Sequence, residues 1–416
     1  MTSTYNYHQL PNGIKLIHRQ KTGQIAHLAL MVDTGSRDEL PHEFGLAHLI
    51  EHMIFKGTKK RKAFHVLSRL ENVGGELNAY TTKEETCIHA SFLSQYCDRS
   101  MELLADIAFS ASYPAHELEK EKEVVLDEIN SYKDAPSEQI FDDFEDQIFD
   151  GHPIGHPILG TSDLVKSFSR NDLLRFIKRN YASSRMVLAL IGDVPFSSFV
   201  KQAEKHFNSA ASNQIIPTRN GFSDYAPKLQ KQTRNSYLSH CITGNIAYDR
   251  KHPLKHSIVL LNNILGGPGL NSRLNLNIRE KYGFAYSIES HYTAYTDTGV
   301  FLVYLGIDPK SADKALKLVH KELFKLKNQK LGTLQLHRAQ QQLIGQLAIG
   351  FESGLSEALS IARSHLLFDR VDDMTVIAEK IRKTNASLLM EVAQQIFDTD
   401  QFNTLIYLGN PNHADA

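Results

Sequence analysis

The chain has 416 residues, of which 42% are hydrophobic and 22% charged, and its formal net charge is −1. This length predicts two or three domains, and the composition is that of an ordinary globular protein. The balanced charge argues against nucleic acid or an anionic membrane as a partner, and no apolar run approaches the roughly eighteen residues of a membrane span.

The first residues and the cysteines indicate the compartment. Residues 1–7 lack a basic segment followed by an apolar core, so we expect no signal peptide. The three cysteines, Cys87, Cys97 and Cys241, are scattered and form no C-x-x-C pair, which is typical of buried thiols in a reducing compartment. We therefore expect a cytoplasmic protein whose cysteines bind no metal.

Hydrophobic periodicity and turn residues predict the elements of the first half. After strands at 13–19 and 25–34 comes a polar loop, then an apolar helix that contains His48-Leu49-Ile50-Glu51-His52 and ends at Gly57. The further predicted elements are a helix at 63–72, strands at 76–82 and 86–93, helices at 95–111 and from His116 onward, a loop at 153–160, a strand at 185–194 and a helix at 197–207.

The pentapeptide has the spacing of a metal site on a helix. Residues four apart share a face, so His48 and His52 can bind one ion together. Glu51 lies on the neighbouring part of that face, where a carboxylate can take a proton from a metal-bound water. The pattern H-x-x-E-H is the reversed form of the H-E-x-x-H zinc helix. Most of the twenty histidines are expected to be ordinary core or surface residues. Burying two His and one Glu on an apolar helix without partners would destabilise the fold by on the order of several kcal/mol, so we expect these three residues to have a common partner.

A site with two histidines needs a third protein ligand, because a catalytic zinc usually has three plus a water. The long helix from His116 is rich in charges, most of which are expected to form a solvated face. Glu121 and Glu128 are the exceptions, because they lie seven residues apart on one face and Glu128 adjoins an apolar stripe. We expect Glu128 to be the third ligand and Glu121 to support it, although spacing alone does not select Glu128 over Glu123 or Asp127.

Two further histidines lie in the loop at 153–160 and just before it. His152 and His156 could be ligands in principle, but the neighbouring Gly and Pro residues favour turn positions.

The middle of the chain, residues 209–230, loses periodicity and gathers Asn, Ser, Pro and Gly. We place a linker at 213–230, between an N-terminal domain at 1–212 and a C-terminal domain at 231–416. The predicted elements of the second half are a strand at 236–245, helices at 257–265 and 272–281, strands at 285–294 and 299–307, helices at 312–325 and from Gln335, and a strand at 404–408.

The second half thus repeats the order of the first, as expected for a duplication. Asn262 and Asn263 fall where the first half has Glu51 and His52. Ala339 and Gln346 fall at the positions of Glu121 and Glu128. Only the first half is therefore expected to bind a metal.

H-x-x-E-H followed by a glutamate 76 residues after the second His resembles the pitrilysin-type (M16, inverzincin) zinc peptidases. This family includes the mitochondrial processing peptidase and insulin-degrading enzyme. The motifs that carry the resemblance are Gly45-Leu46-Ala47-His48-Leu49-Ile50-Glu51-His52, Gly74-Gly75-Glu76-Leu77-Asn78-Ala79-Tyr80-Thr81, Glu121 with Glu128, Ser272-Arg273-Leu274, and Arg279-Glu280-Lys281-Tyr282-Gly283-Phe284-Ala285-Tyr286. The resemblance covers essentially the whole chain, whose length is similar to that of the short bacterial members.

The resemblance implies a fold and a metal site. The fold is α+β, with two homologous domains that each have a mixed, largely antiparallel sheet with helices packed on one face (the processing-peptidase/LuxS-like metallohydrolase fold). His48, His52 and Glu128 would bind one zinc ion per chain, with Glu51 as the general base and Glu121 as a supporting carboxylate.

The resemblance also implies how a peptide binds. Asn78 and Ala79 would lie on an edge strand that pairs with the substrate backbone. Arg279 and Tyr286, from the second half, would contact the peptide and the developing oxyanion. Without the resemblance, we would interpret Arg279 as a surface helix residue and Tyr286 as a core strand residue.

The expected function is zinc-dependent endopeptidase activity on unstructured peptides or presequence-like segments, within a chamber formed by two domains. The family implies a homodimer, and a heterodimer with a related chain is also compatible with the sequence. One alternative is a non-catalytic partner subunit of a processing-peptidase-like complex, which the complete ligand set disfavours. A zinc hydrolase acting on a small molecule is the third hypothesis, and a small closed pocket would favour it.

Overall fold

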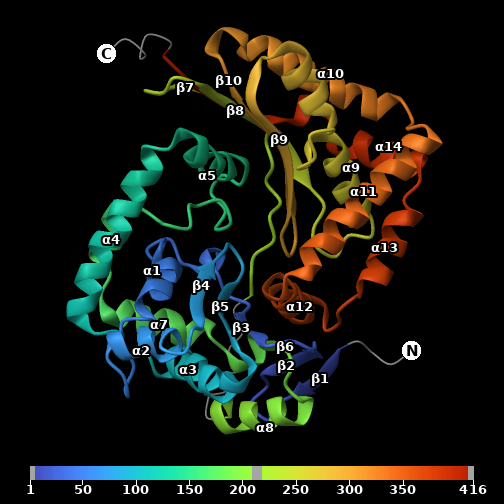
Figure 1. Ribbon diagram of the computed structural model, residues 1–416. Coiled ribbons are helices and arrows are strands. Elements are labelled where there is room, and N and C mark those ends of the chain that lie inside the picture. The colour runs from blue at the N-terminus through green and yellow to red at the C-terminus, as the bar shows by residue number, and fades with distance from the viewer. Residues whose placement is uncertain (1–4, 209–217, 411–416) are drawn as a thin grey trace. The chain divides into compact units, whose positions relative to one another are not determined.

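The computed structural model describes residues 5–208 and 218–410. Two compact units make up the chain (Figure 1). Unit 1 consists of the described residues of Met1–Asn130, His156–Arg219 and Ala348–Asp373, and unit 2 of those of Ser131–Gly155, Asn220–Leu347 and Met374–Ala416. Among the described residues, no helix combines the length and the apolar character needed to cross a membrane.

Unit 1 is organised by a six-stranded sheet with the strand order β1-β2-β6-β3-β5-β4. Strands β2 and β6 are parallel, whereas the other neighbours are antiparallel. The strands are β1 (Asn6–Gln9), β2 (Lys15–Gln20), β3 (Ile25–Val32), β4 (Glu76–Thr81), β5 (Thr86–Leu93) and β6 (Met186–Gly192). Strand β4 is an edge strand, because β5 is its one partner among the described residues.

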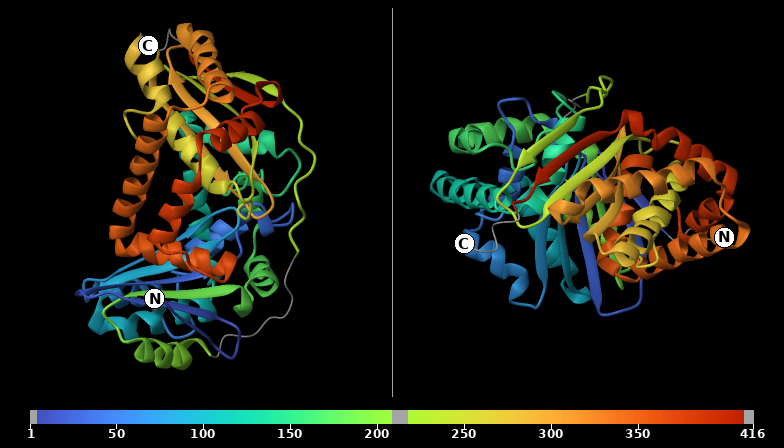
Figure 2. Two further views of the ribbon diagram at one scale, coloured as in Figure 1. Left: turned by 90° about the vertical axis from the view of Figure 1, so that its right-hand side faces the viewer. Right: turned by 90° about the horizontal axis from the view of Figure 1, so that it is seen from above.

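Both faces of this sheet are buried, because successive side chains of a strand point to opposite faces. On β3, Leu28 and Leu30 belong to the core cluster shared with most of the helices, whereas Ala29 and Met31 pack with α12. Figure 2 shows α8 and α12 on opposite faces of the sheet. The helices of unit 1 are α1 (Leu46–Met53), α2 (Ala63–Glu71), α3 (Cys97–Ser110), most of α4 (Ala115–Lys133), α6 (Ser162–Ser167), α7 (Arg170–Asn180), α8 (Phe196–Phe207) and α12 (Gly354–Phe368).

Unit 2 has a five-stranded sheet with the order β7-β11-β8-β10-β9. Here β7 and β11 are parallel and the remaining neighbours antiparallel, so β11, β8, β10 and β9 repeat the arrangement of β6, β3, β5 and β4. The strands are β7 (Leu229–Thr233), β8 (Ser239–Ala247), β9 (Ala285–Ala294), β10 (Gly299–Ile307) and β11 (Asn403–Leu408). This repeat of strand order is what a duplicated chain predicts.

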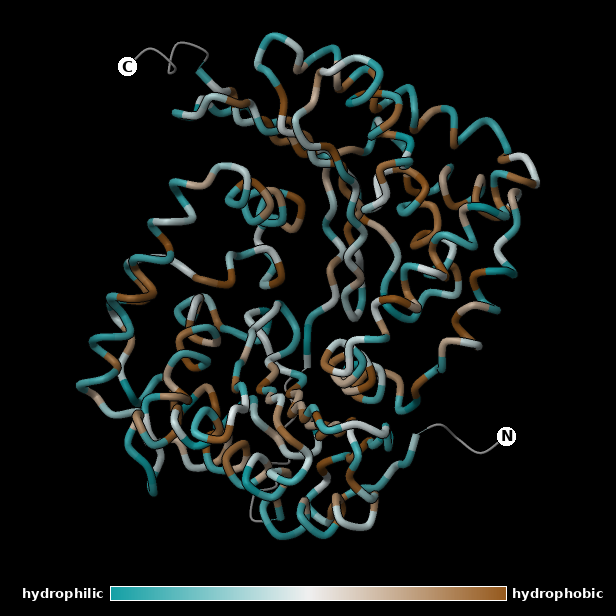
Figure 3. Tube along the Cα trace, in the orientation of Figure 1, coloured by the Kyte–Doolittle hydropathy of each residue, from teal (hydrophilic) through white to brown (hydrophobic). Residues whose placement is uncertain are grey.

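The sheet of unit 2 is also covered on both faces. Helix α5 contributes Ile140 and Phe144 to one face, next to Ile242 and Tyr407, and the other helices cover the opposite face. Figure 3 shows hydrophobic segments in both the helices and the strands of each unit. The helices of unit 2 are α5 (Pro136–Ile148), α9 (Lys255–Gly266), a π-helical segment (Asn275–Glu280), α10 (Ala312–Asn328), most of α11 (Thr333–Glu352), α13 (Met374–Lys383) and α14 (Ala386–Ile396).

The predicted α+β fold with two mixed, largely antiparallel sheets is confirmed. Beyond the helices expected on one face, each sheet has a helix on its other face, and that helix comes from the opposite half of the sequence. The units therefore differ from the continuous ranges 1–212 and 231–416 in the segments 131–155 and 348–373. The physical reason is that each sheet has a second apolar face, which the exchanged helix packs against.

Of the predicted linker 213–230, residues 213–217 lie outside the described residues. The end of the predicted linker already belongs to the sheet of unit 2, because β7 begins at Leu229.

Candidate metal centre

Helix α1 holds the predicted metal-binding residues, and its apolar face fixes its orientation. Leu49, Ile50 and Met53 are buried in the core of unit 1. His48, Glu51 and His52 lie on the other side of the helix and are partly buried. The sequence pattern thus places the three polar side chains together on the side of α1 that faces away from the core.

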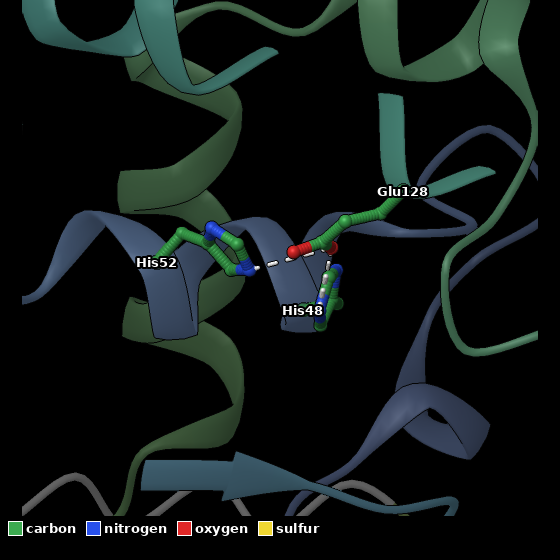
Figure 4. Close-up of side chains that lie close together, drawn as sticks. All are labelled: His48, His52 and Glu128. Atoms are coloured by element: carbon green, nitrogen blue, oxygen red, sulfur yellow. Dashed lines mark ion pairs between the residues drawn. The ribbon is translucent and has the colours of Figure 1, made fainter. Parts of the chain in front are cut away.

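The structure brings His48, His52 and Glu128 together (Figure 4). Glu128 comes from α4, and its Oε2 lies 3.6 Å from Nε2 of His48 and 3.6 Å from Nε2 of His52. Donors about 2.0–2.2 Å from one tetrahedral zinc would be separated by roughly 3.3–3.6 Å. Two imidazoles and one carboxylate are also the donor set of a catalytic zinc site. The two histidine–glutamate distances therefore fit a shared zinc ion, and all three donor atoms lie within 4.8 Å of one another.

His48 is set up as a neutral ligand. Burial, with a smaller contribution from His52, lowers the pKa of His48 to about 3. Its imidazole is therefore uncharged at neutral pH and keeps a lone pair for a metal ion.

The second nitrogen of His52 contacts Glu121, the predicted supporting carboxylate. Glu121 is buried on α4, and its Oε2 lies 3.2 Å from Nδ1 of His52. The other oxygen, Oε1, lies 2.5 Å from Nζ of Lys56, just after α1. A carboxylate on the non-ligating nitrogen orients a metal-bound imidazole and increases its basicity. The sequence reasoning missed Lys56, and nothing in its spacing distinguishes it from other surface lysines.

Glu51, the predicted general base, is half-buried beside the histidines. Burial raises the pKa of Glu51, an effect that outweighs the opposite influence of the Thr81 hydroxyl and of His52. A carboxylate whose pKa is raised toward neutrality is a better proton acceptor at the pH of the cell. Thr81 is the last residue of the edge strand β4, so Glu51 lies close to the end of that strand.

The predicted substrate-binding residues Asn78 and Ala79 lie in the middle of β4. Asn78 is exposed, and its side-chain oxygen accepts a hydrogen bond of 3.0 Å from the Ala79 N–H. Because β4 has β5 as its one partner strand among the described residues, its other edge can pair with a peptide in extended conformation.

Arg279 and Tyr286 lie in unit 2. Arg279 belongs to the π-helical segment, where its Nη1 lies 3.4 Å from Oδ1 of Asn275. Tyr286 is on β9 with 78% of its surface exposed, so the interpretation as a core strand residue is wrong. Their roles toward a bound peptide stay predictions.

The two loop histidines that were alternative ligands have other partners. His152 Nε2 lies 3.1 Å from the Asn220 carbonyl oxygen, and His156 Nε2 lies 2.8 Å from Oε2 of Glu39. Neither belongs to the group of donors around Glu128. The sequence reasoning placed Glu39 in a polar loop and gave it no role.

Comparisons with known proteins agree with this geometry. Residues 15–162 match the family model described as "Insulinase (Peptidase family M16)", and residues 167–343 match "Peptidase M16 inactive domain". A Rickettsia bellii protein named "Uncharacterized zinc protease" is 30% identical over 425 aligned residues, which cover 100% of both chains. A Bacillus subtilis protein named "Uncharacterized zinc protease YmxG" is 29% identical, covering 95% of this chain and 96% of its own length.

Two solved structures share the fold. A protease from Helicobacter pylori matches with a TM-score of 0.92 at 23% identity, covering 97% of this chain and 99% of its own. A peptidase M16 inactive domain from Pseudomonas fluorescens matches with a TM-score of 0.91 at 18% identity, covering 98% of each chain. Together, the family models on both halves and the full-length relative show that this chain belongs to the M16 (insulinase) peptidase family.

Proposed function

We propose that the protein is a zinc-dependent endopeptidase that holds one zinc ion per chain. The observation that carries this proposal is the convergence of His48, His52 and Glu128, with Glu51 beside them. The names of the relatives support the same activity. The alternative of a non-catalytic partner subunit is disfavoured, because such a subunit has no need of a complete ligand set.

The chemistry is metal-assisted hydrolysis of an amide bond. A zinc ion held by the three ligands would polarise the scissile carbonyl and lower the pKa of a water in the remaining position. Glu51 takes a proton from the attacking water and delivers it to the leaving amine. Glu121 keeps the His52 ring oriented, so that its Nε2 continues to face the site.

The proposed substrates are unstructured peptides or presequence-like segments. The free edge of β4 supports this choice, because an extended backbone can add to it as a further strand. For Arg279 and Tyr286 we propose the roles that the family resemblance implies, contact with the peptide and with the developing oxyanion. A homodimer whose domains enclose a chamber is the proposed assembly, and light scattering of the purified protein would distinguish it from a monomer.

The deciding experiment combines metal analysis with peptide cleavage. Purified protein is expected to contain about one zinc per chain and to cleave an unstructured peptide. Glu51→Gln is expected to abolish cleavage while keeping the zinc, because it removes the base and no ligand. Glu128→Gln is expected to lose zinc on dialysis. Metal-free wild-type protein, or full activity in Glu51→Gln, would contradict the proposal.

A further inference from the structure

Helix α1 begins without a cap of its own. Its N-cap residue is Gly45, which has a positive φ of 99° and offers no side chain, and its first turn contains no acidic residue. The carboxylate of Glu39 takes the place of a cap. Oε2 accepts a hydrogen bond of 3.0 Å from the Gly45 N–H, and Oε1 accepts one of 2.6 Å from the Ala47 N–H. Glu39 thus binds the backbone immediately before the predicted ligand His48.

Glu39 is itself held in place by His156. The Glu39 side chain has 0% exposure, and its Oε2 lies 2.8 Å from Nε2 of His156. The His156 ring stacks on Phe44, the residue before the N-cap, with ring centroids 3.7 Å apart. The loop of His156 also approaches the helix start closely, because a Cβ on Gly160 would lie 2.1 Å from the Phe44 carbonyl oxygen. The carboxylate is therefore fixed from two sides inside the protein.

The same buried group connects to the turn between β4 and β5. Lys83, in that turn, donates a hydrogen bond of 2.6 Å from Nζ to the His156 carbonyl oxygen. The loop that carries Glu39 pairs with the same turn, because the Ser36 N–H donates to the Thr82 carbonyl oxygen at 3.0 Å. One network of hydrogen bonds thus joins the start of α1 to the turn that follows the edge strand β4.

We propose that Glu39, held by His156, is a positioning residue that sets the place of His48 relative to Glu128 and His52. His48 lies in the first turn of α1, whereas Glu51 and His52 lie in its last turn. The first turn has unpaired N–H groups and the positive end of the helix dipole, and both favour a buried carboxylate. Without it the first turn is free to shift, and a shift of about 1 Å at a catalytic site is costly.

This inference rests on the proposed function only in taking the ion of the site to be zinc or a substitute for it. The competing explanation is that the Glu39–His156 pair stabilises the fold and has no effect on the site. Buried pairs of this kind are weak evidence for stability by themselves. A measurement of ligand geometry therefore decides between the two explanations, and thermal stability does not.

The test uses the full chain loaded with Co²⁺, whose visible absorption reports the ligand geometry. Glu39→Gln replaces one accepting oxygen with an NH₂ group, and His156→Ala removes the partner of the carboxylate. In both variants the Co²⁺ absorption bands are expected to shift, and Zn²⁺ affinity is expected to fall about tenfold or more. In peptide cleavage, kcat is expected to fall while KM stays near the wild-type value.

Two controls make the result specific. His156→Gln retains an N–H donor near the position of Nε2 and is expected to restore the wild-type spectrum. His206→Ala removes another histidine–carboxylate pair of unit 1, with the same 2.8 Å distance to Asp98, and is expected to leave the spectrum unchanged.

A folded His156→Ala protein with the wild-type Co²⁺ spectrum and Zn²⁺ affinity would overturn the inference, even if Glu39→Gln fails to fold. Loss of affinity in His206→Ala to the same degree would also overturn it. If wild-type protein binds Co²⁺ but cleaves no peptide, the proposed function fails while the spectra of the variants still decide the role of Glu39.

Discussion

Glu121 Oε2 lies 3.2 Å from Nδ1 of His52, the ring nitrogen that faces away from Glu128. The two glutamates of α4 thus act on opposite nitrogens of one imidazole. Glu128, the proposed fellow ligand, faces Nε2, and Glu121 contacts both Nδ1 and Lys56. Their spacing of seven residues, two helical turns, puts both carboxylates on the same side of α4.

The first prediction concerns this contact. Glu121→Gln is expected to weaken zinc binding about 10- to 100-fold, because it removes the charge that orients His52 and leaves Lys56 without its ionic partner. Zinc affinity is measured by competition with a chromophoric chelator. Glu123→Gln, at an exposed position of the same helix, is the matched control and is expected to bind zinc like the wild type. Equal zinc affinity in Glu121→Gln and Glu123→Gln would show that Glu121 does not support metal binding.

The second prediction concerns the stability of metal-free protein as a function of pH. The folded-state pKa of Glu51 is raised above its ordinary value of 4.5, mainly by burial. Above the unfolded-state pKa, the unfolded chain releases this proton more readily than the folded chain, so the ionised group destabilises the fold. Glu51→Gln is therefore expected to raise the Tm of metal-free protein at pH 7, and this gain is expected to vanish below about pH 4.5.

Thermal unfolding in the presence of a chelator, at pH 7 and at pH 4, measures this difference. The exposed Glu123→Gln variant again serves as the control and is expected to show no gain at either pH. An equal Tm gain for Glu51→Gln at pH 7 and at pH 4 would contradict a raised pKa of Glu51.

The third prediction concerns the edge strand. The Ala79 N–H donates a hydrogen bond of 3.0 Å to the Asn78 side chain, a contact that a peptide backbone could replace. Ala79→Pro removes that N–H and is expected to raise KM for a peptide substrate about fivefold or more, the cost of one lost hydrogen bond. Ala79→Ser keeps the N–H and is expected to behave like the wild type. Wild-type KM in a folded Ala79→Pro protein would argue against strand addition at β4.

The fourth prediction concerns the exchanged helix α12. Ile361 is fully buried in the cluster that covers the second face of the unit 1 sheet. Ile361→Ala is expected to destabilise unit 1 by about 2–5 kcal/mol, measured by denaturant unfolding. Ile349 is 76% exposed, so Ile349→Ala is the matched control and is expected to change the unfolding free energy by less than about 0.5 kcal/mol. Equal losses in both variants would mean that α12 does not seal this face.

Local patterns in the sequence predicted much of the fold. The bounds of β5, β9 and β10 agree with the predicted strands at 86–93, 285–294 and 299–307. In these segments β-branched and aromatic residues lie between turn residues, so local preference and tertiary structure agree. The helix of His48 and His52 was also predictable, because its apolar residues have helical spacing.

Contacts between distant segments could not be predicted in this way. Glu39 and His156 are 117 residues apart, and nothing in either local pattern indicates that they meet. The predicted third ligand was a similar case, because the spacing on α4 is compatible with Glu123 and Asp127 as well as with Glu128. The resemblance to a family supplied that choice. The helix exchange was missed because a helical pattern identifies an apolar face but not the sheet that this face covers.

The exchange of α5 and α12 has a consequence for synthesis of the protein on the ribosome. The last strand of the unit 1 sheet, β6, ends at Gly192, and α12 begins roughly 160 residues later. At ordinary rates of translation, α12 is synthesised roughly ten to thirty seconds after β6, so the second apolar face of the sheet lacks its covering helix during that time. The nascent chain is therefore expected to expose Ala29, Met31 and Val187, which pack with α12 in the folded protein, during that interval. Chaperones that bind apolar surfaces are thus expected to engage this protein late in its synthesis, after its first sheet has formed.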